Sequence, residues 1–180
     1  RGGNRRWSVL VHFLCVVSAY FVFASQLYAV NPAATIAILG IPYFLASFLL
    51  MFGNFSQHIF VDPDRHNNSY ALTFNLIDSP ENKFAYNDGY HVIHHVNSRL
   101  HWSKMPAEFM RTLDTHAKQD AFAFYGLCFN DVGFLVMTGQ LEKLAEHYVD
   151  YGQPSRTTAQ VVAEFKRRLR AIPADTPLPA

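Results

Sequence analysis

Three histidines follow a short polar turn in the middle of the chain. After residues 87–89 (Asn-Asp-Gly), His91, His94 and His95 stand at positions i, i+3 and i+4. On a helix, His91 shares a face with each of the others at roughly 5–6 Å, so two imidazoles can converge on one metal ion. His94 and His95 point about 100° apart around the axis, so two adjacent ions could divide the three rings. The spacing predicts a metal site.

A second polar pair stands at the end of a long apolar segment. Asn54 and His58 are one helical turn apart in an otherwise apolar run. Polar groups at membrane depth are costly unless they face a site or a partner. The pair alone fits an ordinary helix end equally well, but together with the three histidines it predicts a second group of ligands.

Cysteine cannot supply this site. The chain has only two cysteines, Cys15 and Cys128, which are far apart, so neither a disulfide framework nor a zinc–cysteine site is expected. Histidine is the unusual component, at nine residues, and four of the nine lie between His91 and His101. The histidines outside the two motifs are interpreted as ordinary: His12, His66, His116 and His147.

These motifs resemble those of the membrane fatty acid desaturase and hydroxylase superfamily. His91-x-x-His94-His95 is similar to the last of the family's three histidine boxes, and Asn54-x-x-x-His58 to the end of the preceding membrane helix. Residues 57–63, 87–90 and 101–106 also resemble an algal or protist branch of the family. The resemblance extends over residues 1 to about 150.

The resemblance implies a set of site residues. The iron ligands would be His58, His91, His94 and His95, with Asn54 holding an iron-bound water and no catalytic residue beyond the metal ligands. Asp88 and His101 are candidates to support the ligands from behind. Asp88 could instead cap the His91 helix, and His101 could equally be a packed or surface histidine.

The resemblance also implies an activity, with two iron ions as cofactor. It would be O₂-dependent removal of two hydrogens from an acyl chain of a membrane lipid or other acyl substrate. The chain has no HPGG haem signature, so electrons would come from a separate donor protein, either cytochrome b5 or a ferredoxin. Related hydroxylation is a third possibility, since the ligand motifs do not distinguish the two reactions.

The family's first two boxes, of the forms HxxxH and HxxHH, have no counterpart in this sequence. Four histidines and one asparagine cannot complete a di-iron site. We therefore expect either the C-terminal part of a longer enzyme, which a start at Arg1 favours, or a reduced relative without catalysis. The competing function is a non-catalytic membrane subunit that packs in a larger complex.

The elements that would position the site begin with two uncharged runs. The 180 residues are 50% hydrophobic with a net charge of +1, yet Asp, Glu, Lys and Arg are absent from 9–30 and from 32–60. The first run would measure roughly 33 Å as a helix, enough to cross a bilayer. Asn31 can cap a second helix with Pro32 in its first turn, and Gly40 and Pro42 should bend it.

We expect transmembrane spans at about 9–30 and 33–53, joined as an antiparallel hairpin, within a first domain of residues 1–60. A secretory signal is the alternative for the first run. Arg1, Arg5 and Arg6 flank the first run and the turn is uncharged, so the N-terminus and the His box should face the cytosol, stroma or matrix. The membrane would be that of the endoplasmic reticulum or of an organelle. Glycosylation of the Asn67 sequon would contradict this topology.

The remaining chain is expected to be helical, which gives an all-α integral membrane fold. A His-box and interfacial domain would occupy residues 61–150, with a helix at 106–118, a helical pair in 120–137 and an amphipathic helix at 140–149. The apolar run in 120–137 is not predicted as a third span, because a central Asp131 is expensive in lipid.

The third region, residues 151–180, is expected to be a basic amphipathic helix followed by a flexible tail. Thr157-x-x-Gln160 is a capping box, and Pro173–Ala180 is the tail. The cationic face could contact anionic lipid headgroups or could simply be solvated, and nucleic-acid binding is not expected. Its cations are Lys166, Arg167, Arg168 and Arg170.

Overall fold

The computed structural model describes residues 2–151 and 155–172, with side chains from residue 6 onward. The chain divides into two compact units between Leu50 and Met51, inside a helix. Arg1 and the segments 152–154 and 173–180 lie outside the described residues, and with them the predicted flexible tail at 173–180.

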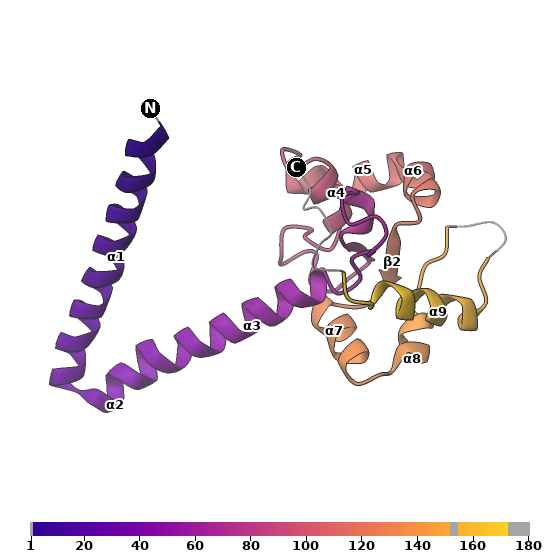
Figure 1. Cartoon of the computed structure of the whole chain (residues 1–180). Helices are drawn as coiled ribbons and strands as arrows, with labels where there is room; N and C mark the ends of the chain where they lie inside the picture. The colour runs from indigo at the N-terminus through magenta and orange to yellow at the C-terminus, as the bar shows by residue number, and fades with distance from the viewer. Residues whose placement is uncertain (1, 152–154, 173–180) are drawn as a thin grey trace. The chain divides into compact units, whose positions relative to one another are not determined.

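The first unit is made of apolar helices (Figure 1). It contains α1 (Gly2–Val30), α2 (Pro32–Thr35), the π-helical turn η1 (Ile36–Gly40) and the start of α3 (Ile41–Gln57). Two stretches, Arg6–Val30 and Pro32–Gln57, are long and apolar enough to cross a membrane, with mean hydropathies of 2.0 and 2.1. Their side chains are largely exposed, as they would be on helices covered by lipid.

The predicted helix start after the first span is confirmed. The side chain of Asn31 accepts a hydrogen bond from the backbone N–H of Ala34 at 3.0 Å, with Pro32 in the first turn. The sequence predicts a bend at Gly40 and Pro42. The structure has the π-helical turn η1 here, which ends at Gly40, and Pro42, which has no backbone N–H to donate, follows two residues later.

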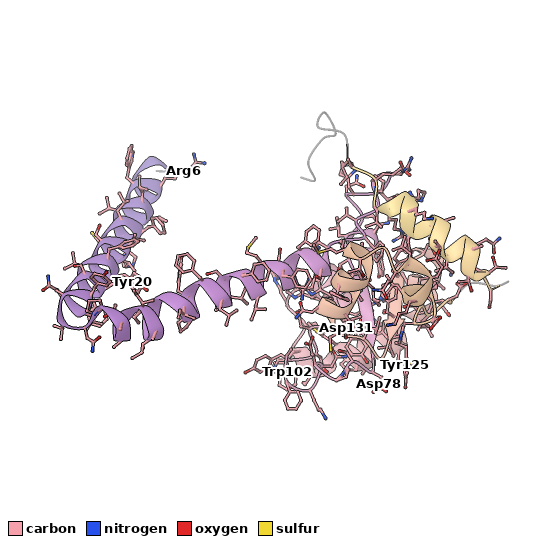
Figure 2. The ribbon with its side chains drawn as sticks, turned by 90° about the horizontal axis from the view of Figure 1, so that it is seen from below. Arg6, Tyr20, Asp78, Trp102, Tyr125 and Asp131 are labelled. Atoms are coloured by element: carbon pink, nitrogen blue, oxygen red, sulfur yellow. The ribbon has the colours of Figure 1, made fainter. Side chains whose placement is uncertain are left out.

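The second unit contains a small sheet, which corrects the all-helical expectation. Strands β1 (Phe74–Ile77) and β2 (Phe122–Tyr125) pair in parallel, with Phe74 opposite Phe122. At the exposed end of β2, the Tyr125 hydroxyl donates to Asp78 at 2.9 Å (Figure 2). Residues 120–137 are therefore not a helical pair, because strand β2 occupies the first part of the segment.

The helices of this unit surround the sheet, and in Figure 1 α5 and α6 lie on the opposite side of β2 from α7 and α8. The α-helices are α4 (His91–Val96), α5 (Met105–Arg111), α6 (Leu113–Lys118), α7 (Phe129–Met137), α8 (Leu141–Ala145) and α9 (Thr158–Arg168). Two short 3-10 turns, η2 (Ser69–Ala71) and η3 (Trp102–Lys104), complete the unit.

Two predicted helices differ in extent from the observed ones. The helix expected at 106–118 is interrupted at Thr112, whose φ of −107° and ψ of 17° end α5 and begin α6. The helix expected at 140–149 stops at Ala145, because the backbone of residues 147–149 instead bonds to β2. Tyr125 N–H donates to the His147 carbonyl at 2.8 Å, and Val149 N–H to that of Ala123 at 2.9 Å.

The main core is aromatic and joins the two strands to the segment after α3 and to α7, α8 and α9. Its fully buried rings come from the end of the α3 segment, from both strands and from α9: Phe60, Phe74, Phe122, Phe124 and Phe165. Ring centroids of Phe60 and Phe165 are 5.1 Å apart. Burial of such large apolar rings is the dominant favourable contribution to folding of this unit.

Helix α9 begins with the predicted capping box, in which Thr157 and Gln160 exchange hydrogen bonds. The prediction of a cationic face on this helix is confirmed for two of its residues and wrong for Arg168. Lys166 and Arg170 are exposed, but Arg168 is 1% exposed and its guanidinium lies 3.6 Å from the centre of the Phe122 ring. A cation placed in the core by internal partners cannot contact lipid headgroups.

Candidate metal centre

The end of α3 carries the first histidine of the site. Ser56, in the last turn of α3, is fully buried against α7. A methyl group placed on Gly133 of α7 would lie 2.0 Å from the Ser56 Oγ atom, so only glycine permits this approach. The contact fixes the helix end, and His58 follows directly after Gln57, the last residue of α3.

Strand β1 positions the second and third histidines through its side chains. The buried Asn75 Oδ1 accepts a hydrogen bond from the backbone N–H of Val92 at 3.2 Å, in the first turn of α4. The preceding loop is tied to β1 as well, because Asn82 Oδ1 accepts from Gly89 N–H at 3.0 Å while Asn82 Nδ2 donates to the Leu76 carbonyl. These hydrogen bonds fix the position of the first turn of α4 relative to strand β1.

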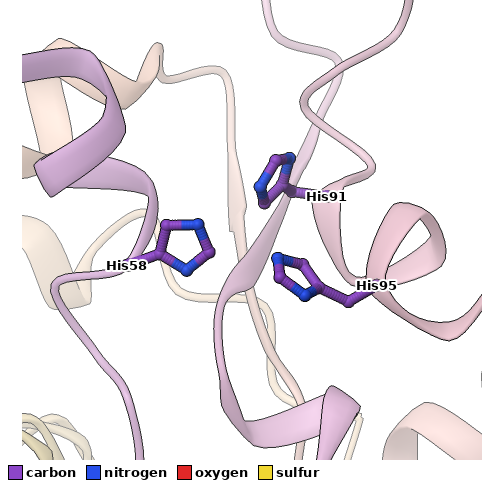
Figure 3. Close-up of side chains that lie close together, drawn as sticks. All are labelled: His58, His91 and His95. Carbon is purple, nitrogen blue, oxygen red and sulfur yellow. The ribbon is translucent and has the colours of Figure 1, made fainter. Parts of the chain in front are cut away.

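These elements bring His58, His91 and His95 together (Figure 3). One ring nitrogen of each residue lies within 4.8 Å of those of the other two. The ring centroid of His58 is 5.3 Å from that of His91 and 5.1 Å from that of His95, and the centroids of His91 and His95 are 5.0 Å apart. This is the one group of three or more potential metal ligands among the described His, Cys, Asp and Glu residues.

Two of the three rings are oriented by partners on their Nδ1 atoms. His58 Nδ1 lies 3.0 Å from the Leu72 carbonyl oxygen, to which it can only donate. His91 Nδ1 lies 2.9 Å from Asp88 Oδ1, whose other oxygen accepts from Gln57 Nε2. In the neutral tautomer that these contacts favour, each ring carries its proton on Nδ1 and has its lone pair on Nε2, where a cation can bind.

Burial favours the neutral form of two rings of the cluster, those of His58 and His95. Burial, together with the neighbouring rings of His91 and His58, lowers the pKa of His95 to about 4. Burial also lowers the pKa of His58, although its bond to Leu72 acts in the opposite direction. Burial raises the pKa of Asp88, but the hydrogen bond and charge of His91 outweigh it and hold that pKa below its usual range. The neutral rings of His58 and His95 and the negative charge of Asp88 both favour binding of a cation.

The remaining residues expected at the site lie around the cluster. His94 is exposed, with its ring 5.4 Å from that of His91, and it is not one of the three converging residues. Asn54 is exposed on α3, one turn before His58. His101 caps η3 and lies 2.9 Å from the Ser103 hydroxyl, stacked against Trp102. The roles of these three residues as ligands or supporting groups stay predictions.

The proposed supporting role of Asp88 matches its contact with the His91 ring, and the residue before α4 is Tyr90 rather than Asp88. Sequence reasoning missed Gln57 and Leu72. Gln57 stands beside His58 and could have been suspected as a polar residue at the end of an apolar helix. Leu72 contributes a backbone carbonyl, which no residue type signals.

Two of the histidines interpreted as ordinary each place Nδ1 against a backbone carbonyl oxygen. His116 is buried in α6, where its Nδ1 donates to the Thr112 carbonyl at 2.9 Å and burial lowers its pKa. His147 Nδ1 lies 3.0 Å from the Tyr125 carbonyl oxygen. Neither belongs to the cluster.

Comparison with known proteins gives one match. A family model described as "Fatty acid desaturase" matches residues 1–127, which include both candidate spans and all three clustered histidines. Neither the curated proteins nor the solved structures contain a match to the chain.

Proposed function

The chain belongs to the fatty acid desaturase family, and on that premise we propose that it is a desaturase-like membrane enzyme that introduces a double bond into an acyl chain. His58, His91 and His95 would bind one iron ion of a di-iron centre. His94 and Asn54, the latter through a water, would contribute to the rest of it. Electrons would come from a separate cytochrome b5 or ferredoxin.

The observation that supports this proposal most directly is the convergence of three imidazoles, in which one ring nitrogen of each lies within 4.8 Å of those of the other two. Imidazole is a suitable ligand for iron, and the Nδ1 partners of His58 and His91 fix both rings in the ligating tautomer. The residues present therefore fit an iron ion.

When bound, iron would supply the activation of dioxygen, which no side chain can perform alone. The chain's own contribution is different in kind. Asp88 holds the His91 ring and balances part of the cation's charge, while the Leu72 carbonyl holds the His58 ring. The two apolar helices, exposed along their length, would give an acyl chain access from the lipid.

The membrane and the sidedness belong to the same proposal. The chain would lie in the membrane of the endoplasmic reticulum or of a plastid or mitochondrion. Its N-terminus and metal centre would face the cytosol, stroma or matrix, because cationic residues such as Arg6 precede the first span and none stands in the turn.

The alternative is a non-catalytic desaturase-like subunit of a larger membrane complex. It is favoured by the size of the cluster, since three converging imidazoles account for the ligands of one ion rather than two. The two functions differ in whether the protein binds iron and forms double bonds.

The test is iron quantification together with intact mass and product analysis, on protein purified from its native membrane. The desaturase proposal expects bound iron, a fatty acid product with one added double bond, and loss of both in His91→Ala. His147→Ala, outside the cluster, is the matched control and should retain both. Native protein of about the mass of this chain, with neither iron nor product, would leave the non-catalytic subunit.

A further inference from the structure

Helix α9 lies beyond the segment that the family model matches, yet it contacts the residues next to the metal centre. His58 is followed at intervals of two by Phe60 and Asp62, and both of these side chains are fully buried. Each one has a partner on α9. The C-terminal helix thus holds the stretch of chain that leaves α3 at His58.

The first contact is between aromatic rings. Phe165 of α9 is fully buried, and its ring centroid lies 5.1 Å from that of Phe60. It also packs against Phe122 and Phe124 of β2, at 5.5 and 5.7 Å. The ring of Phe60 is therefore held between the sheet and α9, which fixes the backbone two residues after His58.

The second contact is a two-pronged ion pair. The guanidinium of Arg167 donates to both oxygens of the Asp62 carboxylate, at 2.8 and 2.7 Å. Glu164, one turn earlier on α9, holds the same guanidinium with bonds of 2.8 and 2.7 Å. The ion pair and further hydrogen bonds hold the pKa of Asp62 far below its usual range, although burial opposes this. Paired geometry of this kind fixes direction as well as distance.

Through its backbone, Asp62 also holds the residue next to Leu72, whose carbonyl contacts the His58 ring. The backbone N–H of Asp62 donates to the Ala71 carbonyl at 2.8 Å, so residues 62–71 form a closed loop. The next carbonyl, that of Leu72, is the group that orients the His58 ring. Thr73 closes the same loop on α3, because its hydroxyl donates to the Gln57 carbonyl at 2.6 Å.

We propose that α9 is a positioning element of the metal centre, in which Arg167 holds the 58–72 loop so that His58 meets His91 and His95. Arg167 touches no metal ligand and is a positioning residue rather than a catalytic one. The inference rests on the proposed function only where it concerns metal binding. The position of the His58 ring is a property of the metal-free chain as well.

The experiment compares Arg167→Gln with Arg111→Gln in the full chain, reconstituted in lipid nanodiscs. The control is matched in its ion pair, because Arg111 also pairs with a glutamate three residues earlier, Glu108, but pairs with neither Asp62 nor Asp64 of the 58–72 loop. Arg167→Lys keeps the charge without the two-pronged geometry. It serves as the second variant if Arg167→Gln does not fold.

The first readout needs no metal. Diethyl pyrocarbonate modifies accessible imidazoles, and mass spectrometry gives the rate at each histidine. We expect His58 to react several-fold faster in Arg167→Gln, to an intermediate degree in Arg167→Lys, and at the wild-type rate in Arg111→Gln. Unchanged rates at His58 in a folded Arg167→Gln protein would overturn the proposal.

The second readout is Co²⁺ affinity and the visible spectrum of bound Co²⁺, which reports the ligand set. Loss of a group that orients a ligand typically weakens metal binding by about 10–100-fold, and we expect Arg167→Gln to fall in that range with an altered spectrum. A purely structural role would lower the melting temperature and leave affinity and spectrum unchanged well below it. Wild-type protein that binds no Co²⁺ would count against the metal function, while the His58 reactivity would still decide the positioning role.

Discussion

The Nδ1 atoms of His58 and His91 are each used by the protein, one by the Leu72 carbonyl and the other by Asp88. The two partners differ in kind. A carbonyl fixes the ring and its tautomer, whereas a carboxylate also adds negative charge behind the ligand and raises its basicity. Asp88 itself is held by Gln57, so the charge stays aligned with His91.

Substitution of Asp88 by asparagine should therefore weaken metal binding more than it alters the fold. Asp88→Asn keeps an oxygen for the His91 Nδ1 proton but removes the charge, so Fe²⁺ or Co²⁺ affinity should fall by about 10–100-fold. The measurement is a metal titration. Asp78→Asn, which alters an exposed carboxylate bonded to Tyr125, is the control and should bind as the wild type does. Equal affinities for the two variants would rule out a role for the charge.

The lowered pKa of His95 predicts a pH dependence in the metal-free protein. The unfolded chain takes up a proton near pH 6.5, but folded His95 does so only near pH 4, because burial disfavours the charged ring. The free energy of unfolding should fall as pH drops from about 6.5 towards 4, since the unfolded state binds more protons there. Denaturant titrations of wild type and His95→Asn measure it. The variant should lose less stability across this range, and a loss as large as that of wild type would show that other groups are responsible.

At the scale of elements, the metal centre depends on how α3 meets α7. The closest approach is between Ser56 and Gly133, whereas Gly53, one turn earlier on α3, has only an ordinary contact with Asn130 at 3.8 Å. The two glycines thus lie at the same helix contact but in different surroundings. Only one of them is required by packing.

Gly133→Ala should destabilise the second unit by about 1–3 kcal/mol, because the added methyl group must displace Ser56. It should also weaken metal binding, since Ser56 stands two residues before His58. Gly53→Ala places a methyl group in ordinary van der Waals contact with Asn130 and should be neutral or stabilising by about 0.5–1 kcal/mol. Thermal unfolding and Co²⁺ titration of both variants test this. Similar behaviour of the two would contradict the close approach.

At the scale of the whole molecule, the two apolar helices and the family both indicate a membrane protein. Their sidedness is a separate prediction from the charges at the N-terminus. Asn67 offers a clean reporter because it is exposed, in a turn, and begins an Asn-Asn-Ser sequon. It would be accessible to glycosylation if its unit were lumenal.

Synthesis in microsomes should leave Asn67 without a glycan. The positive control is the same chain extended by one more membrane span and a reporter with a sequon. The added span places the reporter in the lumen, where it should be glycosylated. An endoglycosidase-sensitive mass increase that disappears in Asn67→Gln would show that the second unit is lumenal and that the predicted topology is inverted.

The sequence by itself determined the features that depend on neighbours along the chain. The spacing of His91 and His95 places their rings on one face of α4, the capping box at Thr157 starts α9, and the length of the apolar runs gives two span-like helices. Hydrogen bonds within one turn and hydrophobic periodicity are local, so residue types alone encode them.

The tertiary structure decided which groups meet. Phe122–Tyr125 is a short apolar run that periodicity cannot assign, and it became a strand because it pairs with residues almost fifty positions earlier. His58 reached the cluster, and exposed His94 did not join it, because of packing between α3, β1 and α7. Arg168 looked like a surface cation but is buried between Glu164, Asp120 and Phe122. The burial of a side chain and its hydrogen-bond partners on the backbone depend on the whole fold, so a local sequence pattern does not predict them.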